Sequence, residues 1–511
     1  MKKIVSILLI LALMLPVFAG CSEGGGTDEK ESEQTAANPN AETEGGEEET
    51  EEETRYAASI PEGTSYTGST FTVLTYPNDG SIWTDVDWSA EEITGEVLND
   101  AVYKRTQKVE DLLDVEIATA YLTGRGDLST IESSVLSGDH AYQLATVAMQ
   151  NSFTIAMNGR VHELNDFAKQ GTLDLDAPWW DPNILGELSI GNKNFCLTGD
   201  IGTMYKKSIG VIMFNKVLYE SYQLGEKAGE ALGTATASPY DLMSAGKWTM
   251  DQMVNLGTTV SKDLDGDGKM TQEDQYGLIC FCNMLAIAMI GGEVVYFSKD
   301  ADDMPYDTFM SERAVSVLEK LATLMYNADI TYSWSRAGVG EDPAFTMYQS
   351  DKALFYYGEL HAVATMRDMN SDFGIMPMPK YDEAQAGYHH CVNPDVAATY
   401  VIPKDNLDYE KTGYIMDALG AESKNELTPA YYDISLRGKV SRDQESAASL
   451  DVIIGSVRYD VGYLGGYGIT AMLNTMADAY NTDLASQYAR QTKVIQKNLD
   501  RMLTKFEALN P

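Results

Sequence analysis

The sequence predicts an α/β fold built on mostly parallel sheets flanked by helices, and three observations support this prediction. Runs rich in β-branched residues alternate with segments of helical spacing, in strand–helix–strand units of about 25–30 residues. Turn signals rich in Pro, Asn, Asp and Gly close several of these runs. A chain of 511 residues with 44% hydrophobic and 22% charged residues is typical of a globular protein of two or three domains.

Residues 1–21 carry the features of an export signal. A basic start precedes the apolar run 4–18, which is too short to span a hydrocarbon core of ~30 Å. The tripeptide Ala19-Gly20-Cys21 resembles a bacterial lipoprotein processing site, at which Cys21 would become the acylated first residue of the mature chain. We therefore expect a Gram-positive-type lipoprotein on the extracellular face of the cell membrane. The alternative is an ordinary secretory signal with an incidental cysteine.

Residues 22–54 form a low-complexity acidic segment. It contains 13 acidic residues and one lysine, and it has no aromatic or branched aliphatic side chain. Such a segment buries too little apolar surface to offset the entropy of ordering, so we expect a disordered tether. The folded part would then be residues 55–511.

The strong acidity of the chain restricts its partners. There are 77 Asp and Glu residues against 37 Lys and Arg residues, and the formal net charge is −40 at pH 7. Such a surface repels phosphate backbones, which argues against binding to nucleic acid. No segment after the leader is apolar for long enough to cross a bilayer. We expect a monomer that touches the membrane only through its lipid.

The folded part predicts strands and helices in alternation. Its first elements are a strand at 71–76, a helix at 98–113, a strand at 115–119, a helix at about 127–136 and a strand at 142–149. Later strands are expected at 209–214, 352–357, 373–377 and 398–402. Later helices are expected after the N-cap Thr249, at 312–326 and at 484–506.

Four cysteines follow the leader: Cys196, Cys280, Cys282 and Cys391. One disulfide is possible in an exported protein. Cys280 and Cys282 alternate in an apolar run, which favours buried free thiols over a bridge. The spacing of the cysteines matches no zinc motif.

Residues 263–274 have the pattern of a calcium-binding loop. Acidic residues stand at loop positions 1, 3 and 5, a glycine stands at 6, and further oxygen donors stand at 7, 9 and 12. The expected donors are Asp263, Asp265, Asp267, the carbonyl of Lys269, Thr271 and Asp274. Asp replaces the usual Glu at the last position, which shortens that ligand. We expect structural Ca²⁺ here, and the alternative is an acidic turn without metal.

Motifs for covalent chemistry are missing. The sequence has no Gly-x-Ser-x-Gly elbow, no His-Glu-x-x-His, no phosphate loop and no dinucleotide fingerprint. A pair of carboxylates for glycoside hydrolysis cannot be located from sequence among so many acids. The sequence therefore favours a binding protein over an enzyme.

Tryptophans in predicted loops indicate a site for sugars. An indole ring covers the apolar face of a sugar, and neighbouring carboxylates accept hydrogen bonds from its hydroxyls. The candidates for stacking are Trp83, Trp179, Trp180 and Trp334. The alternative for any one of them is packing in the core or between lobes.

Polar candidates come from the expected ends of strands, because ligands of open α/β sheets bind beyond the carboxyl ends of the strands. The residues expected to hydrogen-bond a ligand are Asp79, Gln150, Asp200, Tyr205 and Glu359.

Several stretches match one family. They are the start with Cys21, Val211–Lys216, Trp248–Gln252 with the following 263–274 loop and Tyr276-Gly277, Lys352–Glu359, and Leu436–Ser446. Together they resemble the bacterial extracellular solute-binding proteins of ABC transporters, in particular the large sugar-binding group of Gram-positive lipoproteins. Some relatives carry a structural calcium in a loop of this kind.

The resemblance implies a periplasmic-binding-protein-like fold of type II. Two α/β lobes would be joined by hinge crossings, with the ligand closed between them. We expect the first lobe to comprise about 66–175 and 330–405, and the second lobe about 176–329 and 406–511.

The expected function is capture of an extracellular solute, an oligosaccharide, and its delivery to the permease subunits of an ABC transporter. One alternative is a surface glycoside hydrolase or lyase that uses two carboxylates. A structural adhesin is a third hypothesis. The sequence does not identify the solute.

Overall fold

The computed structural model describes residues 55–81, 83–84, 86–366, 369–432 and 444–509. The chain divides into two units, Met1–Thr54 and Arg55–Pro511, and all of the described residues belong to the second unit. The expected leader, the lipidation site Cys21, the acidic tether and most of the stretch Leu436–Ser446 lie outside the described residues. No helix in the described part of the chain is long and apolar enough to cross a membrane.

The first sheet has four strands in the order β11-β3-β1-β2. Its strands are β1 (Ser69–Thr75), β2 (Val115–Tyr121), β3 (Leu144–Ala148) and β11 (Ala398–Val401). β1 pairs in parallel with β2 and with β3, whereas β11 is antiparallel to β3. The central strand β1 is buried at Phe71, Val73 and Leu74, which explains its run of apolar and β-branched residues.

The second sheet has five strands in the order β10-β4-β9-β5-β8. Its strands are β4 (Gly210–Asn215), β5 (Tyr276–Cys280), β8 (Thr331–Ser333), β9 (Ala353–Glu359) and β10 (Phe373–Met376). β5 pairs in parallel with β8 and β9, and β4 is antiparallel to both of its neighbours. This sheet is therefore mixed, not mostly parallel. A separate two-stranded ribbon consists of β6 (Phe297–Lys299) and β7 (Pro305–Asp307).

Helices cover both sheets. Before β4 they are α1 (Val97–Leu113), α2 (Ser129–Ser137), α3 (Met149–Met157), α4 (Asn165–Lys169), α5 (Ile184–Glu187) and α6 (Met204–Lys207). Between β4 and β11 they are α7 (Lys216–Ser221), α8 (Leu224–Leu232), α9 (Pro239–Ser244), α10 (Met250–Val260), α11 (Met284–Gly291), α12 (Glu312–Met325), α13 (Trp334–Ala337), α14 (Glu341–Gln349) and α15 (His361–Thr365). After β11 they are α16 (Tyr409–Asn425), α17 (Leu427–Ala430), α18 (Gln444–Gly455), α19 (Val461–Leu464), α20 (Ile469–Asp478) and α21 (Leu484–Ala508).

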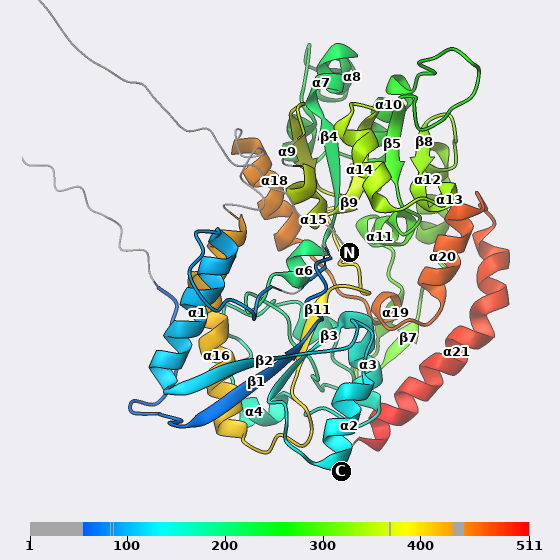
Figure 1. The fold of residues 1–511 in the computed structure, drawn as a ribbon. Coiled ribbons are helices and arrows are strands. Elements are labelled where there is room, and N and C mark those ends of the chain that lie inside the picture. The colour runs from blue at the N-terminus through cyan, green and yellow to red at the C-terminus, as the bar shows by residue number, and fades with distance from the viewer. Residues whose placement is uncertain (1–54, 82, 85, 367–368, 433–443, 510–511) are drawn as a thin grey trace, which may run out of the picture. The chain divides into compact units, whose positions relative to one another are not determined.

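Local sequence signals explain several of these elements. Thr249 caps α10 by accepting a hydrogen bond from the amide of Gln252, as expected from the sequence. Ser311 caps α12 in the same way. α1 packs against α16 beside the first sheet, and α2 and α3 lie on the other side of that sheet (Figure 1). All four cysteines after the leader are free and buried, which confirms the expectation of buried thiols.

Two crossings connect the sheets within the described residues. The first crossing (residues 197–209) leads to β4, and the second crossing (residues 389–397) leads back to β11. They pair with each other through the antiparallel bridge Ile209↔Val392, and the second crossing pairs with a third segment through the bridge His390↔Val457. The crossings therefore form a hydrogen-bonded ribbon and not separate loops.

The structure differs from the expected lobe boundaries in three places. Trp179 and Trp180 lie within 176–329, which is expected in the second lobe, but they pack in the core beside the first sheet. β8, β9 and β10 lie within 330–405, which is expected in the first lobe, but they pair in the second sheet. α16 lies within 406–511, which is expected in the second lobe, but it packs on α1 beside the first sheet. The chain stays in the second sheet from β4 to β10 because helical crossovers join strands of one sheet. It goes back to the first sheet only after β10, through the second crossing.

Candidate functional site

Three parallel strands of the second sheet, β5, β8 and β9, have their carboxyl ends at the same end of the sheet, which is called the strand edge below. β9 ends at Glu359, opposite Gly210 at the start of the antiparallel strand β4, while β5 and β8 run parallel to β9. The residues that follow these strand ends therefore gather at one place. They include Asn283 after β5, Trp334 after β8 and His361 after β9.

Glu359 is the buried anion of this edge, with 7% of the residue exposed. Its Oε1 accepts hydrogen bonds from Nδ2 of Asn283 at 3.3 Å and from Nδ2 of Asn393 at 3.1 Å. Asn393 belongs to the second crossing, so Glu359 joins the second sheet to that crossing. Burial raises the pKa of Glu359 above its ordinary value.

Several polar atoms at this edge are buried without a hydrogen-bond partner among the described residues. They are Oδ1 of Asn283, Nε1 of Trp334, and both ring nitrogens of His361. A buried polar atom left unpaired costs about 1–3 kcal/mol, so natural proteins keep such atoms rare. A ligand bound at the ends of these strands would supply the missing partners.

Two aromatic pairs border these polar atoms. The ring of Trp83, from the segment between β1 and α1, lies 4.2 Å from the ring of His361 at 56°. The ring of Trp334 stacks on Phe281 at 4.2 Å and 28°. Trp83 and Trp334 are both half-buried. The first pair joins the first lobe to the second, so this edge lies between the two lobes.

Asp79 shapes the loop that carries Trp83. Its Oδ1 accepts hydrogen bonds from the amide of Ser81 and the hydroxyl of Thr84, each at 3.0 Å. These bonds, led by those of Ser81, lower the pKa of Asp79 to about 2. Gln150 lies at the start of α3, and its amide donates to the carbonyl of Pro394 at 3.2 Å. The structure thus places both candidates close to the loops of the edge, and their contact with a ligand stays a prediction.

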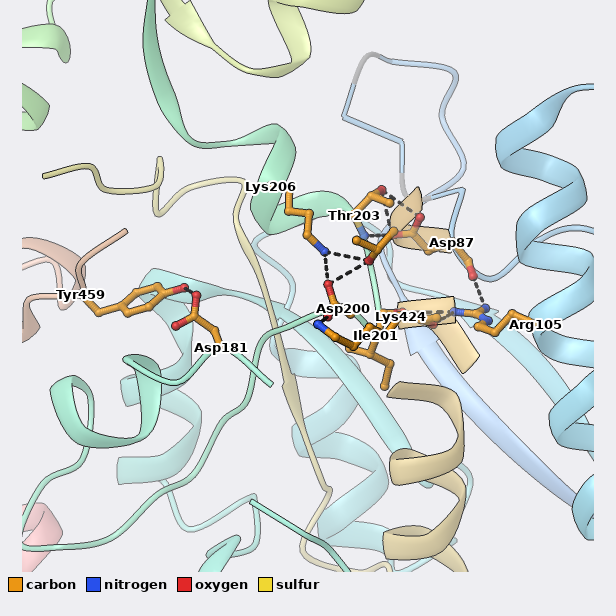
Figure 2. A network of polar contacts seen from close by, with 11 residues as sticks. Asp87, Arg105, Asp181, Asp200, Ile201, Thr203, Lys206, Lys424 and Tyr459 are labelled. Atoms are coloured by element: carbon orange, nitrogen blue, oxygen red, sulfur yellow. Dashed lines mark hydrogen bonds and ion pairs between the residues drawn. The ribbon is translucent and has the colours of Figure 1, made fainter. Parts of the chain in front are cut away.

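Asp200 has protein partners for both carboxylate oxygens. Oδ1 accepts from Nζ of Lys206 at 2.7 Å and from the hydroxyl of Thr428 at 2.8 Å, and Oδ2 accepts from Nζ of Lys424 at 3.0 Å (Figure 2). Burial alone would raise the pKa of Asp200, but the two lysines outweigh it and lower the pKa. Tyr205 is buried beside Lys206, whose Nζ lies 5.0 Å from its ring. This arrangement indicates a structural role for Asp200.

The same network fixes the first crossing to the first lobe. The carboxylate of Asp87 accepts from the amide of Thr203 at 2.6 Å and from its hydroxyl at 2.9 Å. The buried guanidinium of Arg105 donates to the carbonyls of Asp87 and Ile201, the latter at 3.1 Å. Figure 2 shows these groups around the crossing. Residues 200–206 are therefore a rigid anchor from which the chain enters the second sheet.

Trp179 and Trp180 lie in the hydrophobic core of the first lobe, each 4% exposed. Nε1 of Trp179 donates to Asp417 at 3.2 Å, and the ring leaves no room for a side chain at Gly420. The two prolines around the pair predict a loop, which is correct, but the loop is packed inside. The structure does not bring these rings to the edge with Trp83, and their stacking on a ligand stays a prediction.

A cavity of about 480 Å³ shares no lining residue with this edge. Of its charged lining groups, Glu187 pairs with Arg458 at 3.0 Å, Glu293 with His389 at 3.4 Å and Lys299 with Asp303 at 2.9 Å. The carboxylate of Asp460 accepts hydrogen bonds from the amides of Tyr296 at 2.8 Å and Gly462 at 2.7 Å. We place the candidate site at the strand edge instead, because there the buried anion Glu359, the unpaired imidazole of His361 and the ring of Trp83 occur together.

Residues 263–274 form a tight acidic loop between α10 and β5. The carboxylate oxygens of Asp263, Asp265 and Asp267 lie within 4.8 Å of one another. Gly268 has a φ of +78°, the conformation that the sixth loop position requires. Three converging carboxylates fit a hard cation such as Ca²⁺.

The last expected ligand, Asp274, already has partners in the loop. Its carboxylate accepts from the amides of Leu264 at 2.8 Å and Thr271 at 2.7 Å, and these bonds lower its pKa. Asp274 would have to exchange such a bond to ligate a cation. Ligation by Asp274, Lys269 and Thr271 therefore stays a prediction.

Sequence reasoning missed most of the site. It named Trp83, Trp334 and Glu359, but not Asn283, Asn393 and His361, nor Glu341, whose Oε1 lies 3.5 Å from Nε2 of His361. Asn283 comes three residues after the end of β5, and Glu359 is the last residue of β9, so the rule about strand ends applied to every strand would have found Asn283. Nothing in the sequence marks Asn393, because its position depends on the second crossing.

The comparisons support the fold. No protein-family model and no curated protein matches the chain. Among solved structures, an ABC substrate-binding protein of Listeria monocytogenes in complex with cycloalternan is 11% identical, with a TM-score of 0.52, over 86% of this chain and 99% of that one. The cyclic α-maltosyl-1,6-maltose binding protein of Arthrobacter globiformis is 13% identical, with a TM-score of 0.53, over 86% and 98%.

A sugar transporter protein of Rhizobium etli in an open conformation is 13% identical, with a TM-score of 0.55, over 86% of this chain and 99% of that one. At such low identity the likeness shows the fold alone. The fold is the two-lobe solute-binding-protein fold expected from the sequence, and these structural neighbours are binding proteins.

Proposed function

We propose that the protein captures an extracellular oligosaccharide between its two lobes and delivers it to the permease of an ABC transporter, without changing its covalent bonds. The observation that supports this most is the strand edge, where buried polar atoms of Asn283 and His361 have no hydrogen-bond partner and the half-buried ring of Trp83 lies against His361. Such a combination of flat apolar rings and hydrogen-bonding groups suits a sugar.

The structural neighbours favour a sugar as the solute. According to their names, the Listeria monocytogenes protein is in complex with cycloalternan and the Arthrobacter globiformis protein binds cyclic α-maltosyl-1,6-maltose, and both share the fold. In this protein, Glu359 and Asn283 would accept hydrogen bonds from sugar hydroxyls, and Trp83 would cover the C–H face of a ring.

We also propose that a lipid on Cys21 holds the protein at the outer face of the membrane and that residues 22–54 act as its tether. In the folded part, Ca²⁺ would stabilise the loop 263–274 through Asp263, Asp265 and Asp267. A cation there supplies charge neutralisation and takes no part in solute binding.

Titration calorimetry of the purified protein with a panel of neutral oligosaccharides tests the main proposal. We expect saturable binding of one sugar. Trp83→Ala should weaken it about two- to twelvefold, because stacking contributes ~0.5–1.5 kcal/mol. Glu359→Gln should weaken it about tenfold or more, because a hydrogen bond to a charged group contributes ~1.5–3 kcal/mol. Tyr121→Ala removes an exposed ring at the end of β2 and serves as the control. Absence of sugar binding, or equal binding by all variants, would contradict the proposal.

One observation favours an enzyme as the second candidate. Carboxylate oxygens of Glu341 and Glu359 lie within 4.8 Å of each other at the same edge. The carboxyl pair of retaining glycosidases is about 5–5.5 Å apart. Incubation with the sugars that bind, followed by an assay for new reducing ends, separates the two functions: release of reducing ends that Glu341→Gln abolishes would establish hydrolysis.

A further inference from the structure

Three side chains that could ligate a metal converge at the candidate site. Glu341 is the first residue of α14, Glu359 is the last residue of β9, and His361 is the first residue of α15. Only residues 350–352 connect α14 to β9, so the two elements run in opposite directions and the start of the helix lies at the end of the strand. Ligand atoms of all three side chains lie within 4.8 Å of one another.

The spacing within this cluster suits a shared ion better than a hydrogen bond. Nε2 of His361 lies 3.5 Å from Oε1 of Glu341, beyond the usual hydrogen-bond limit of about 3.2 Å. Two ligands at ~2.1 Å from a tetrahedral cation lie about 3.4 Å apart. The Nε2–Oε1 separation therefore matches that of two neighbouring ligands of one metal ion, and the other separations in the cluster lie within 4.8 Å.

His361 is the independent observation that points to a ligand. The residue is 94% buried, since its exposure is 6%, yet neither ring nitrogen has a hydrogen-bond partner among the described residues. In that part of the chain the charged group paired with it is Glu341, at the long distance of 3.5 Å. A buried imidazole in this state lacks a partner that a cation would provide.

The charge of the cluster points the same way. Neither Glu341 nor Glu359 forms an ion pair with a lysine or arginine in the described part of the chain. The amides of Asn283 and Asn393 both donate to Oε1 of Glu359, which orients the carboxylate and leaves Oε2 for another partner. A divalent cation would neutralise the two carboxylates at the place where they meet.

We propose that Glu341, Glu359 and His361 form a binding site for a divalent transition-metal ion of the zinc class. Imidazole nitrogen combined with carboxylate oxygen selects such ions over Ca²⁺ and Mg²⁺. Three protein ligands leave a fourth position for water or for an oxygen of a bound solute. The site is separate from the all-oxygen loop 263–274, and the proposal stands independently of which solute the protein carries.

Calorimetric titration of the EDTA-treated full chain with ZnCl₂ tests the site. We expect one equivalent of Zn²⁺ to bind, and His361→Gln and Glu341→Gln to weaken the affinity by at least tenfold. Asp265→Asn, which alters only the acidic loop, is the control and should bind Zn²⁺ as the unaltered protein does. Thermal melting without metal shows whether each variant is folded, and Glu341 is partly exposed, so its variant should fold in any case.

A second readout is the fluorescence of Trp83. Its ring lies 4.2 Å from that of His361, so Co²⁺ bound to the cluster should quench it, and Trp83→Phe should remove that component. No saturable binding of Zn²⁺, or unchanged affinity in both ligand variants, would overturn the proposal. Sugar titrations of the metal-free protein, run in parallel, report separately on the proposed function.

Discussion

His390 should make the protein sensitive to acid. It is fully buried in the second crossing, where its Nε2 accepts a hydrogen bond from the amide of Met378 at 2.9 Å. Nδ1 lies 2.7 Å from the hydroxyl of Ser456, which itself donates to the carbonyl of Val452 at 2.6 Å. Nδ1 therefore carries the proton and Nε2 has none. A second proton on Nε2 would point at the N–H of Met378.

The magnitude follows from the pKa. Burial, assisted by the charge of His389, lowers the pKa of His390 from 6.5 to about 3. The unfolded chain takes up a proton below pH 6.5 that the folded protein refuses until about pH 3, so stability is lost as the pH falls through this range. At pH 4 the loss is about 3 kcal/mol. For a domain of this size a melting temperature moves by roughly one degree per kcal/mol, so the shift is about 3 °C.

His390→Gln isolates this contribution, because an amide offers one acceptor and one donor but does not titrate. Melting temperatures of the purified variant and of the unaltered protein should be compared between pH 7 and pH 4. We expect the variant to lose about 3 °C less than the unaltered protein over this range. His140→Gln, at an exposed histidine, is the control and should follow the unaltered protein. Parallel pH profiles for His390→Gln and the unaltered protein would refute the reasoning.

Three further perturbations test other parts of the structure. Gly277→Ala should destabilise the protein by about 1–3 kcal/mol, because the added Cβ would lie 2.2 Å from the carbonyl oxygen of Gly257 in α10; an unchanged melting temperature would mean that α10 and β5 are not in close contact. Lys206→Met leaves Asp200 with one lysine instead of two, and it should cost about 3 kcal/mol in thermal or urea unfolding; a neutral effect would show that the pair is not buried. Millimolar Ca²⁺ should raise the melting temperature by about 2–3 °C, as expected for a filled site, and Asp265→Asn should abolish the rise; equal melting curves with Ca²⁺ and with EDTA would contradict the calcium proposal.

The sequence was sufficient for most of the fold. The strand–helix–strand spacing predicted β1, α1, β2, α2 and β3 in order, and the helix after Thr249 begins where its cap predicts. The antiparallel strand β4 is recognisable as a strand, but its direction depends on the long first crossing and not on local pattern. The expected lobe boundaries differ from the observed ones for the same reason. No local sequence pattern marks the point at which the chain crosses from the second sheet back to the first.

The site was predictable only in part. Glu359 is the last residue of a strongly apolar strand, so the rule about strand ends identified it. Asp200 is also a polar residue near an expected strand end, but its carboxylate forms ion pairs with Lys206 and Lys424. Neither ion pair can be predicted from the spacing of these residues in the sequence. For Trp179 the flanking prolines do predict a loop, but whether a loop packs inward depends on helix α16, which follows more than 200 residues later.

The ring contact between Trp83 and His361 means that the proposed sugar site is partly occupied by the protein itself. A sugar that binds here must first separate the indole of Trp83 from the imidazole of His361 before it can lie against either ring. A ring pair of this kind is worth about 0.5–1.5 kcal/mol, so the observed affinity would be roughly two- to twelvefold below that of the same place with its rings already apart. Weakening this self-contact without removing the indole, for example by trimming His361, is therefore a route to tighter capture.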